Sequence, residues 1–152
     1  MFDSDLQKEI KGVCLGLLAR REYSQKELLD RLAVKGFERD ESLCVIEDLA
    51  EQNWQSDNRF AESYTRYRIR KGIGPVKISH ELWQRGIEGF DMDPVVLELA
   101  ESWLELLQKV YEKKYTDEAL ISQKEWLKRS RFLQQRGFSS EMINRYLKTN
   151  NK

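Results

Sequence analysis

Few residues in this chain have the types and spacing that catalysis or metal binding requires. His80 is the only histidine, and no group of cysteine and histidine residues has zinc-site spacing. Asp91 and Asp93 lie close together just before a proline, where carboxylates favour the positive end of a helix. Residues 71–74 contain two glycines but lack the Gly-Lys-Ser/Thr of a phosphate loop. We therefore interpret His80 as a surface or packing residue and 71–74 as a turn, and we expect no enzyme activity, metal site or cofactor.

The two cysteines and the N-terminus bear on where the protein works. Cys14 and Cys44 lie among apolar neighbours, which predicts two buried thiols in a reducing compartment. No run of residues approaches the roughly 18 apolar residues of a membrane span. Acidic residues within the first five positions do not resemble a signal peptide. These features predict a cytoplasmic protein without membrane association.

Charge is strongly segregated along the chain although the formal net charge is zero. Residues 38–62 contain eight acidic and two basic side chains, and residues 88–118 contain nine acidic and three basic ones, so each stretch carries a net charge of −6. Residues 59–85 carry +5 and residues 120–152 carry +6. Such blocks give a dipolar surface that can meet a basic partner and a polyanion with different faces, or they are simply solvated helix faces.

The basic central stretch supplies the candidate partner-binding residues. Arg66 and Arg70 are one helical turn apart and are expected on the polar side of one helix. Tyr64 and Tyr67, interleaved with the arginines, would suit stacking on single-stranded nucleic acid if they were exposed, whereas an apolar stripe on the same helix would turn them toward the core. The candidate residues are Arg59, Arg66, Arg70, Lys71, Lys77 and Arg85.

A repeat of about fifty residues must position these side chains. Segments 32–37, 82–87 and 133–138 share one pattern: a leucine, two variable residues, a lysine or arginine, a glycine and a large apolar residue. Their glycines are 50 and 51 residues apart. In such a segment the leucine ends a helix, the glycine adopts a left-handed conformation, and the apolar residue folds back on the last turn. Three copies at one period predict a repeat architecture.

Helix starts agree with this period. Segments 24–27, 102–105 and 122–125 each fit a Ser-x-x-Glu capping box, and a proline at 75 or 94 suits a first helical turn. The segments 94–101 and 102–114 could also form one continuous helix. The predicted helices lie near residues 4–20, 24–35, 40–53, 57–71, 75–85, 94–101, 102–114, 122–136 and 139–149.

The expected fold is therefore all-α, with three tandem three-helix repeats of about fifty residues forming an elongated curved array. We expect a single repeat-array domain over residues 1–152. Its repeats would span about 4–54, 55–101 and 102–149. The four tryptophans, Trp54, Trp83, Trp103 and Trp126, are expected in the core or between repeats.

Several short segments of this chain resemble the RecX family. Residues 55–61 (Gln-Ser-Asp-Asn-Arg-Phe-Ala) are similar to the motif that opens that family's second repeat, although Trp54 and Ser56 depart from its usual Tyr and acidic residue. The stretch 71–78 resembles the family's central segment and is the most specific part of the likeness. The likeness covers roughly residues 10–148. Its remaining matches lie at 23–28, 81–82, 85–87, 131–133 and 136–138.

The resemblance implies a regulator rather than an enzyme. Members of that family bind the RecA recombinase, including its filament on single-stranded DNA, and inhibit its recombinase, ATPase and co-protease activities. By this likeness the protein would act in recombination, DNA repair and the SOS response, as a monomer. The residues themselves leave two alternatives open: a helical nucleic-acid-binding protein that uses the basic central repeat, and an adaptor for another protein partner.

Overall fold

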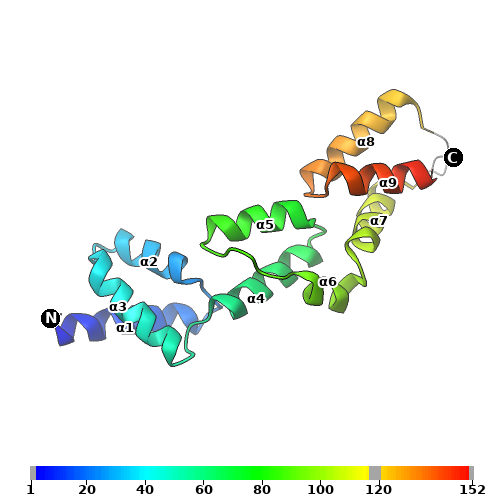
Figure 1. Ribbon diagram of the computed structural model, residues 1–152. Coiled ribbons are helices and arrows are strands. Elements are labelled where there is room, and N and C mark those ends of the chain that lie inside the picture. The colour runs from blue at the N-terminus through cyan, green and yellow to red at the C-terminus, as the bar shows by residue number, and fades with distance from the viewer. Residues whose placement is uncertain (1–2, 117–120, 151–152) are drawn as a thin grey trace. The chain divides into compact units, whose positions relative to one another are not determined.

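The computed structural model describes residues 3–116 and 121–150, and within these ranges it contains nine α-helices and no strand (Figure 1). Each helix matches a predicted one to within about two residues, so the predicted all-α fold is confirmed. No helix in the described residues is long and apolar enough to cross a membrane. The helices are α1 Ser4–Leu18, α2 Gln25–Val34, α3 Arg39–Glu51, α4 Asp57–Arg70, α5 Pro75–Gln84, α6 Asp93–Ala100, α7 Trp103–Lys114, α8 Gln123–Gln135 and α9 Ser140–Asn150.

The three glycine-containing segments end α2, α5 and α8 in the same way. In each segment the apolar residue after the glycine donates its amide to the carbonyl of the leucine five residues earlier, at 3.1 Å in 32–37, 2.9 Å in 82–87 and 3.2 Å in 133–138. This bond and positive φ at the preceding residue define the helix-ending motif predicted from the repeat. The φ values are 92° at Gly36, 83° at Gly86 and 98° at Gly137.

Serine residues begin three of the helices as predicted. The Ser24 side chain accepts from the Glu27 amide at 3.0 Å, and the Glu27 carboxylate accepts from the Ser24 amide at 3.1 Å, which completes a capping box. Ser102 and Ser122 accept from the amides three residues later, at 3.1 Å in both cases, but among the described residues only the box at Ser24 has the return bond from its glutamate, so the predicted boxes at 102–105 and 122–125 are half formed.

The alternative of one continuous helix over 94–114 is wrong. Helix α6 ends at Ala100, because Glu101 adopts a φ of 61°. Ser102 then has extended backbone and caps the start of α7. The Ser-x-x-Glu signal therefore outweighed the absence of a glycine or proline between the two helices.

The helices fall into two compact units. Unit 1 contains Met1–Ser63 and Leu82–Phe90, and unit 2 contains Tyr64–Glu81 and Asp91–Lys152. Helices α4 and α5 thus contribute residues to both.

In unit 1, α1, α2 and α3 pack together around an apolar core (Figure 1). Cys14 is fully buried there, and burial raises the pKa of its thiol to about 11. Cys44 is exposed, so its predicted burial is wrong; the neighbouring Val45 and Ile46 occupy the core side of α3 instead. The buried apolar residues of this core are Ile10, Cys14, Tyr23, Leu28, Leu32, Val45, Ile46 and Leu49.

The residues just before and at the start of α4 form hydrogen bonds with the residues around the start of α2. Gln55 is 1% exposed, and its amide nitrogen donates to the Tyr23 carbonyl at 3.2 Å and to Asp57 Oδ1 at 2.9 Å. Asp57 Oδ1 also accepts from the backbone amide of Gln25, at 2.9 Å. Because buried polar groups need partners, this network explains why Gln and Asp stand at these positions of the 55–61 motif.

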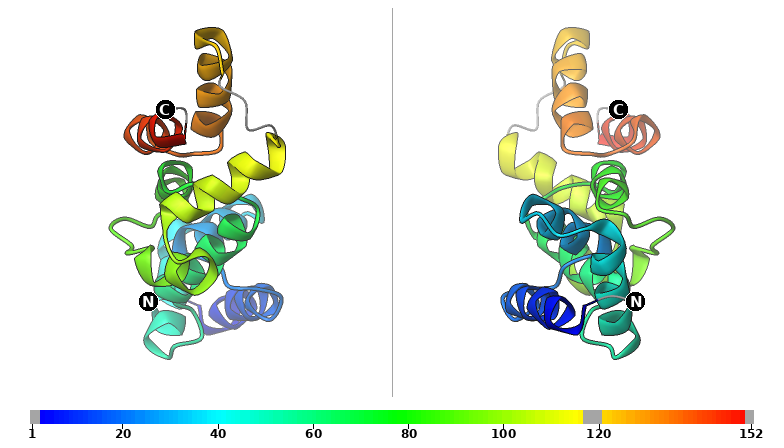
Figure 2. Two further views of the ribbon diagram at one scale, coloured as in Figure 1. Left: turned by 90° about the vertical axis from the view of Figure 1, so that its right-hand side faces the viewer. Right: turned by 90° about the vertical axis from the view of Figure 1, so that its left-hand side faces the viewer.

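In unit 2, α7 packs against α6 and α9, and α8 packs against α9. Figure 2 shows α8 rising from the turn that it shares with α9. Arg129 is 5% exposed, and its guanidinium donates to the Tyr111 hydroxyl at 2.7 Å and to Glu125 at 3.0 Å. It also lies 4.2 Å from the ring centroid of Tyr115. A buried cation is thus stabilised by a carboxylate, a hydroxyl and a ring face.

The start of α5 contacts the end of α8 through backbone groups. The amide of Gly74 donates to the carbonyl of Arg136 at 2.7 Å, and the amide of Val76 donates to the carbonyl of Gly137 at 2.9 Å. The first amides of one helix and the last carbonyls of another have no partners within their own helices. Each end therefore satisfies the other. A Cβ added at Gly74 would lie 2.6 Å from the Gly137 carbonyl oxygen, so only glycine permits this approach.

Three large aromatic side chains lie outside the core; the exposure of Trp54 and Trp83 is contrary to prediction, whereas for Tyr67 the sequence left exposure open. Trp54 is 58% exposed, Trp83 is 59% exposed and Tyr67 is 53% exposed. On α4 the buried residues include Thr65 and Ile69, and Tyr67 falls between them on the opposite side of the helix. Trp54 lies in the turn after α3 and Trp83 lies on the polar side of α5, whereas Trp103 and Trp126 are half-buried.

Candidate partner-binding surface

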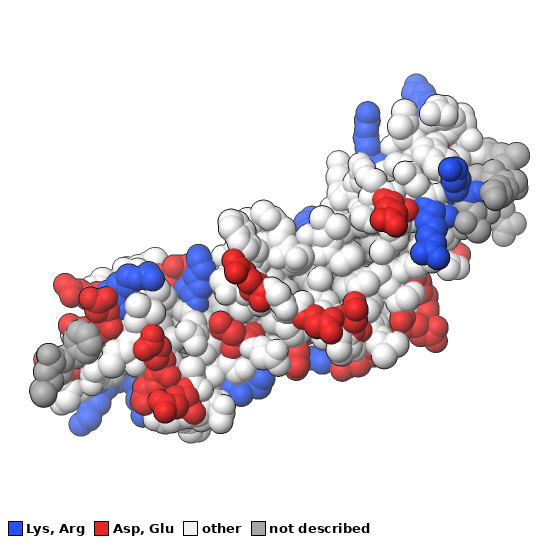
Figure 3. Space-filling model, viewed as in Figure 1, with Lys and Arg blue, Asp and Glu red and all other residues white. Residues whose placement is uncertain are grey.

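The six predicted contact residues do not all lie in one described unit. Arg59 on α4 and Arg85 after α5 belong to unit 1. The remaining four, Arg66, Arg70, Lys71 and Lys77, belong to unit 2. Figure 3 shows Lys and Arg interspersed with Asp and Glu on the viewed face rather than one uninterrupted basic surface.

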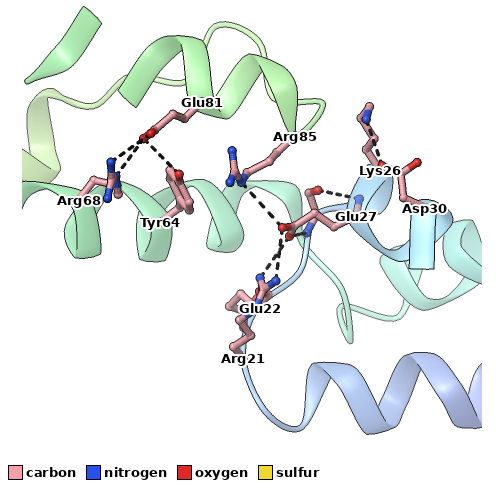
Figure 4. Close-up of polar contacts among 10 residues, drawn as sticks. Arg21, Glu22, Lys26, Glu27, Asp30, Tyr64, Arg68, Glu81 and Arg85 are labelled. Atoms are coloured by element: carbon pink, nitrogen blue, oxygen red, sulfur yellow. Dashed lines mark hydrogen bonds and ion pairs between the residues drawn. The ribbon is translucent and has the colours of Figure 1, made fainter. Parts of the chain in front are cut away.

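Both unit 1 arginines have carboxylate partners. The Arg59 guanidinium lies 3.3 Å from Glu22 and donates to the Asn53 carbonyl at 2.8 Å. Arg85 Nε lies 3.9 Å from Glu27 Oε2, and Figure 4 shows its side chain directed toward that carboxylate. These ion pairs partly neutralise both arginines before any partner is bound.

Further along α4, Arg66 and Arg68 also have carboxylate partners, whereas Arg70 has none among the described residues. Arg66 donates to Glu98, with Nη2 to Oε2 at 3.2 Å. Arg68 makes two hydrogen bonds to Glu81, at 2.9 and 3.1 Å, and the Tyr64 hydroxyl donates to the same carboxylate at 3.1 Å (Figure 4). Arg68 therefore stabilises the contact of α4 with α5. Arg70 is exposed and has no ion pair with any residue that the structure describes.

Lys77 lies at the contact between α5 and α8. Its ammonium donates to the carbonyl of Gln135 at 3.4 Å, beside the backbone bonds from Gly74 and Val76. A cation at the carboxyl end of a helix stabilises the dipole of that helix. Lys77 thus has a structural partner, although its side chain is exposed.

Arg70 and Lys71 line a cavity of about 410 Å³ in unit 2, together with four cations that are not among the six predicted contact residues. These are Lys109, Lys113, Lys114 and Arg136. The three lysines belong to the acidic stretch 88–118, whose net charge hid them. Two signals pointed to them: Lys109 and Lys113 are one helical turn apart, and Arg136 is the cation of the third glycine segment. We call the cavity lined by Arg70, Lys71 and these four cations the cationic cavity.

The floor of the cationic cavity is apolar. It consists of Ile69, Leu106, Val110 and Phe132. Gly72 also lines it, with a φ of 77°, and a Cβ at this position would lie 3.0 Å from the side chain of Val110. The cavity therefore combines a basic rim with an apolar floor, an arrangement that can bind an anion carrying an apolar group.

The described residues contain no group of three or more His, Cys, Asp or Glu side chains that could hold a metal ion. His80 is exposed on α5. What the structure brings together is a set of charged surfaces and one cationic cavity, which are suited to binding.

Comparison with known proteins gives the same family for three successive segments between residues 11 and 147. Family descriptions for the first, second and third three-helix domains of RecX match residues 11–49, 56–93 and 100–147 in that order. The protein named "Regulatory protein RecX" from Pseudomonas fluorescens (strain SBW25) is 37% identical over 138 residues, covering 91% of this chain and 89% of that protein. Its counterpart from Legionella pneumophila (strain Corby) is 37% identical over 134 residues, covering 88% and 89%. The crystal structure of RecX from Lactobacillus salivarius has the same fold, with a TM-score of 0.77 at 22% identity, covering 97% of this chain and 98% of that chain.

Proposed function

Because this chain belongs to the RecX family of regulatory proteins, we propose that it binds the RecA recombinase, or the filament that RecA forms on single-stranded DNA, and inhibits it. The inhibited activities would be recombination, ATP hydrolysis and co-protease function. The observation that carries the proposal is the ordered match of all three RecX three-helix domains between residues 11 and 147. The relatives are named regulatory proteins. This name supports a function that acts on another protein and not the turnover of a substrate.

The distribution of charge supports binding to a nucleoprotein filament. Such a filament presents protein carboxylates and DNA phosphates, and separate basic and acidic surfaces can be complementary to different parts of it. The stretch 59–85 has a net charge of +5 and lies in sequence between two stretches of −6. Complementary charge of this kind accelerates association and makes it dependent on salt.

The proposed contact residues remain Arg59, Arg66, Arg70, Lys71, Lys77 and Arg85. Arg70 and Lys71 are the best placed of these, because both are exposed and neither has an ion pair among the described residues. Arg59, Arg66 and Arg85 would have to exchange their present carboxylate partners for those of RecA. We therefore expect the largest effects on binding from Arg70 and Lys71.

The test is single-stranded-DNA-dependent ATP hydrolysis by RecA. The protein should lower the rate at amounts well below one per RecA subunit. The Arg66→Glu/Arg70→Glu variant should inhibit less, mainly through slower association, and should depend less on salt. Its melting temperature should change little, because Arg66–Glu98, the one ion pair that these two side chains form with described residues, is exposed and is worth at most about 1 kcal/mol.

A matched control is Arg131→Glu/Lys148→Glu, which changes the net charge equally at two exposed positions of α8 and α9. The control should inhibit like the unaltered protein. No inhibition by the unaltered protein at a concentration equal to that of RecA would refute the proposed function. Equal inhibition by both variants would refute the role of Arg66 and Arg70 in binding but would leave the proposed function intact.

Direct binding of single-stranded DNA is a second candidate function, and one observation favours it. Tyr67 is 53% exposed, and the Lys71 ammonium lies 5.7 Å from its ring centroid, so an aromatic face and a cation lie side by side. Fluorescence anisotropy with labelled oligothymidine tests this function without RecA. Tyr67→Ala should weaken such binding several-fold if bases stack on this ring. Capture of an unrelated protein, and not of RecA, from a lysate would instead favour the third alternative, an adaptor for another protein partner.

A further inference from the structure

We propose that the cationic cavity of unit 2 binds a short acidic peptide segment of a protein partner, with one bulky aliphatic side chain of that segment inserted against the cavity floor. The proposal rests on the proposed function in that the partner is a protein. It adds the chemistry of the segment that is recognised. The measurement described below uses a peptide and no recombinase, so the two proposals can fail separately.

The positive charge of the rim exceeds the negative charge that the protein itself places beside it. Three helices end at the cavity: α4 with Arg70 and Lys71, α7 with Lys113 and Lys114, and α8 with Arg136. Each helix end is equivalent to about half a negative charge, so the three ends offset about 1.5 of six positive charges. The Glu105 carboxylate, which pairs with Lys109, offsets one more. The remaining excess therefore requires an external anion or solvent.

The contacts of the individual cations agree with this balance. Lys109 forms an ion pair with Glu105 at 3.0 Å, and Arg136 donates to the Lys71 carbonyl at 3.2 Å. Among the residues that the structure describes, Arg70 and Lys113 have neither an ion pair nor a hydrogen bond from their side chains. These two are the cations most available to the carboxylates of a ligand.

The floor favours an aliphatic side chain over a nucleobase. Its aliphatic part, Ile69, Leu106 and Val110, offers no ring for stacking. Phe132 is the only aromatic residue of the lining, and its ring already has the Lys114 ammonium 4.2 Å from the centroid and the Arg136 guanidinium 5.4 Å away. Binding of single-stranded nucleic acid uses open aromatic faces as well as cations. The lining of the cavity provides the cations without such a face, since the exposed Tyr67 ring beside Lys71 is not part of the lining.

Size also indicates a short segment. A volume of about 410 Å³ is in the range of pockets that take small ligands. It accommodates one apolar anchor, while the six rim cations can pair with carboxylates on both sides of that anchor. The expected ligand is therefore a leucine-type residue flanked by Asp and Glu.

The test is fluorescence anisotropy with the full chain and a fluorescein-labelled peptide, Gly-Asp-Glu-Leu-Leu-Glu-Asp-Gly. The peptide should bind, and a version with both leucines replaced by serine should bind at least several-fold more weakly. The Arg70→Gln/Lys113→Gln variant should weaken binding of the leucine peptide about tenfold, since two exposed ion pairs are removed. The control Arg131→Gln/Lys148→Gln loses the same charge at positions outside the cavity and should bind normally. Far-UV circular dichroism checks that both variants remain folded.

Three results would overturn the proposal. One is no detectable binding of the peptide at millimolar protein concentration. Another is equal affinity of the leucine and serine peptides, which would reduce the cavity to a nonspecific electrostatic surface. The third is an oligothymidine of the same charge that binds more tightly than the peptide and loses that affinity in Arg70→Gln/Lys113→Gln, which would assign the cavity to nucleic acid.

Discussion

Replacement of the helix-ending glycines by alanine separates the cost of backbone conformation from the cost of a close contact. Gly36 and Gly137 have similar φ values, 92° and 98°, and end helices with the same hydrogen-bond pattern. Their surroundings differ. A Cβ at Gly36 would meet nothing within 4 Å, whereas a Cβ at Gly137 would collide with the Cβ of Lys77 and lie 3.0 Å from the carbonyl oxygen of Gly74.

The expected loss of unfolding free energy follows from these contacts. At Gly36 alanine incurs only the left-handed backbone penalty of about 1–2 kcal/mol, partly offset because alanine restricts the unfolded chain. The net loss should be about 1 kcal/mol. At Gly137 the same term applies, and overpacking against the backbone adds about 1–3 kcal/mol. The total there should be about 2–4 kcal/mol, since the neighbouring atoms belong to a backbone that cannot rotate away.

Urea unfolding followed by circular dichroism at 222 nm measures both losses. Native-state amide hydrogen exchange then locates the damage, because the amides of Gly74 and Val76 donate to Arg136 and Gly137. Those two amides should exchange faster in Gly137→Ala and at an unchanged rate in Gly36→Ala. Equal losses of stability in the two variants, or unchanged exchange at Gly74 and Val76 in Gly137→Ala, would refute the close contact between α5 and α8.

Three further outcomes are expected. Ellman's reagent should titrate one thiol quickly in the native protein, that of Cys44, and two in urea, because burial raises the pKa of Cys14 to about 11; two fast thiols would contradict the packing of α1. Arg129→Met should lower the unfolding free energy by about 2 kcal/mol, because Tyr111 and Glu125 lose a shared donor, and an unchanged urea midpoint would contradict the buried network. Glu81→Gln should cost about 1 kcal/mol through the loss of charge on the acceptor for Arg68 and Tyr64, and a stability equal to that of the unaltered protein would show that this ion pair contributes nothing measurable.

The sequence by itself determined the secondary structure and the repeat. Glycine after a cation, followed by an apolar residue, specifies a helix end through backbone sterics, and Ser-x-x-Glu specifies a helix start through local hydrogen bonds. Both signals involve residues only a few positions apart. Gly36, Gly86 and Gly137 therefore have the predicted φ > 0, and the break at Glu101 and Ser102 followed the local capping signal.

Side-chain exposure was predictable where the helical period was clear and failed where it was not. Ile10 and Cys14 follow the period of α1 and are buried. Cys44 was expected in the core because of its apolar neighbours, and Trp54 and Trp83 were expected in the core or between repeats because of their residue type, yet all three are exposed. Residue type is a weaker guide than helical phase, since large apolar surfaces also remain on the outside of folded proteins.

Which cations share a site was decided by the tertiary structure alone. Counting net charge along the chain placed Arg59 and Arg85 in one predicted contact set and left Lys109 and Lys113 out of it. Such a count averages over stretches of the chain whose residues face different neighbours. Packing instead paired Arg59 with Glu22, 37 positions away, and brought Arg136 to the carbonyl of Lys71, 65 positions away. Electrostatic interactions depend on distance in space and on burial, and a linear count of charges contains neither.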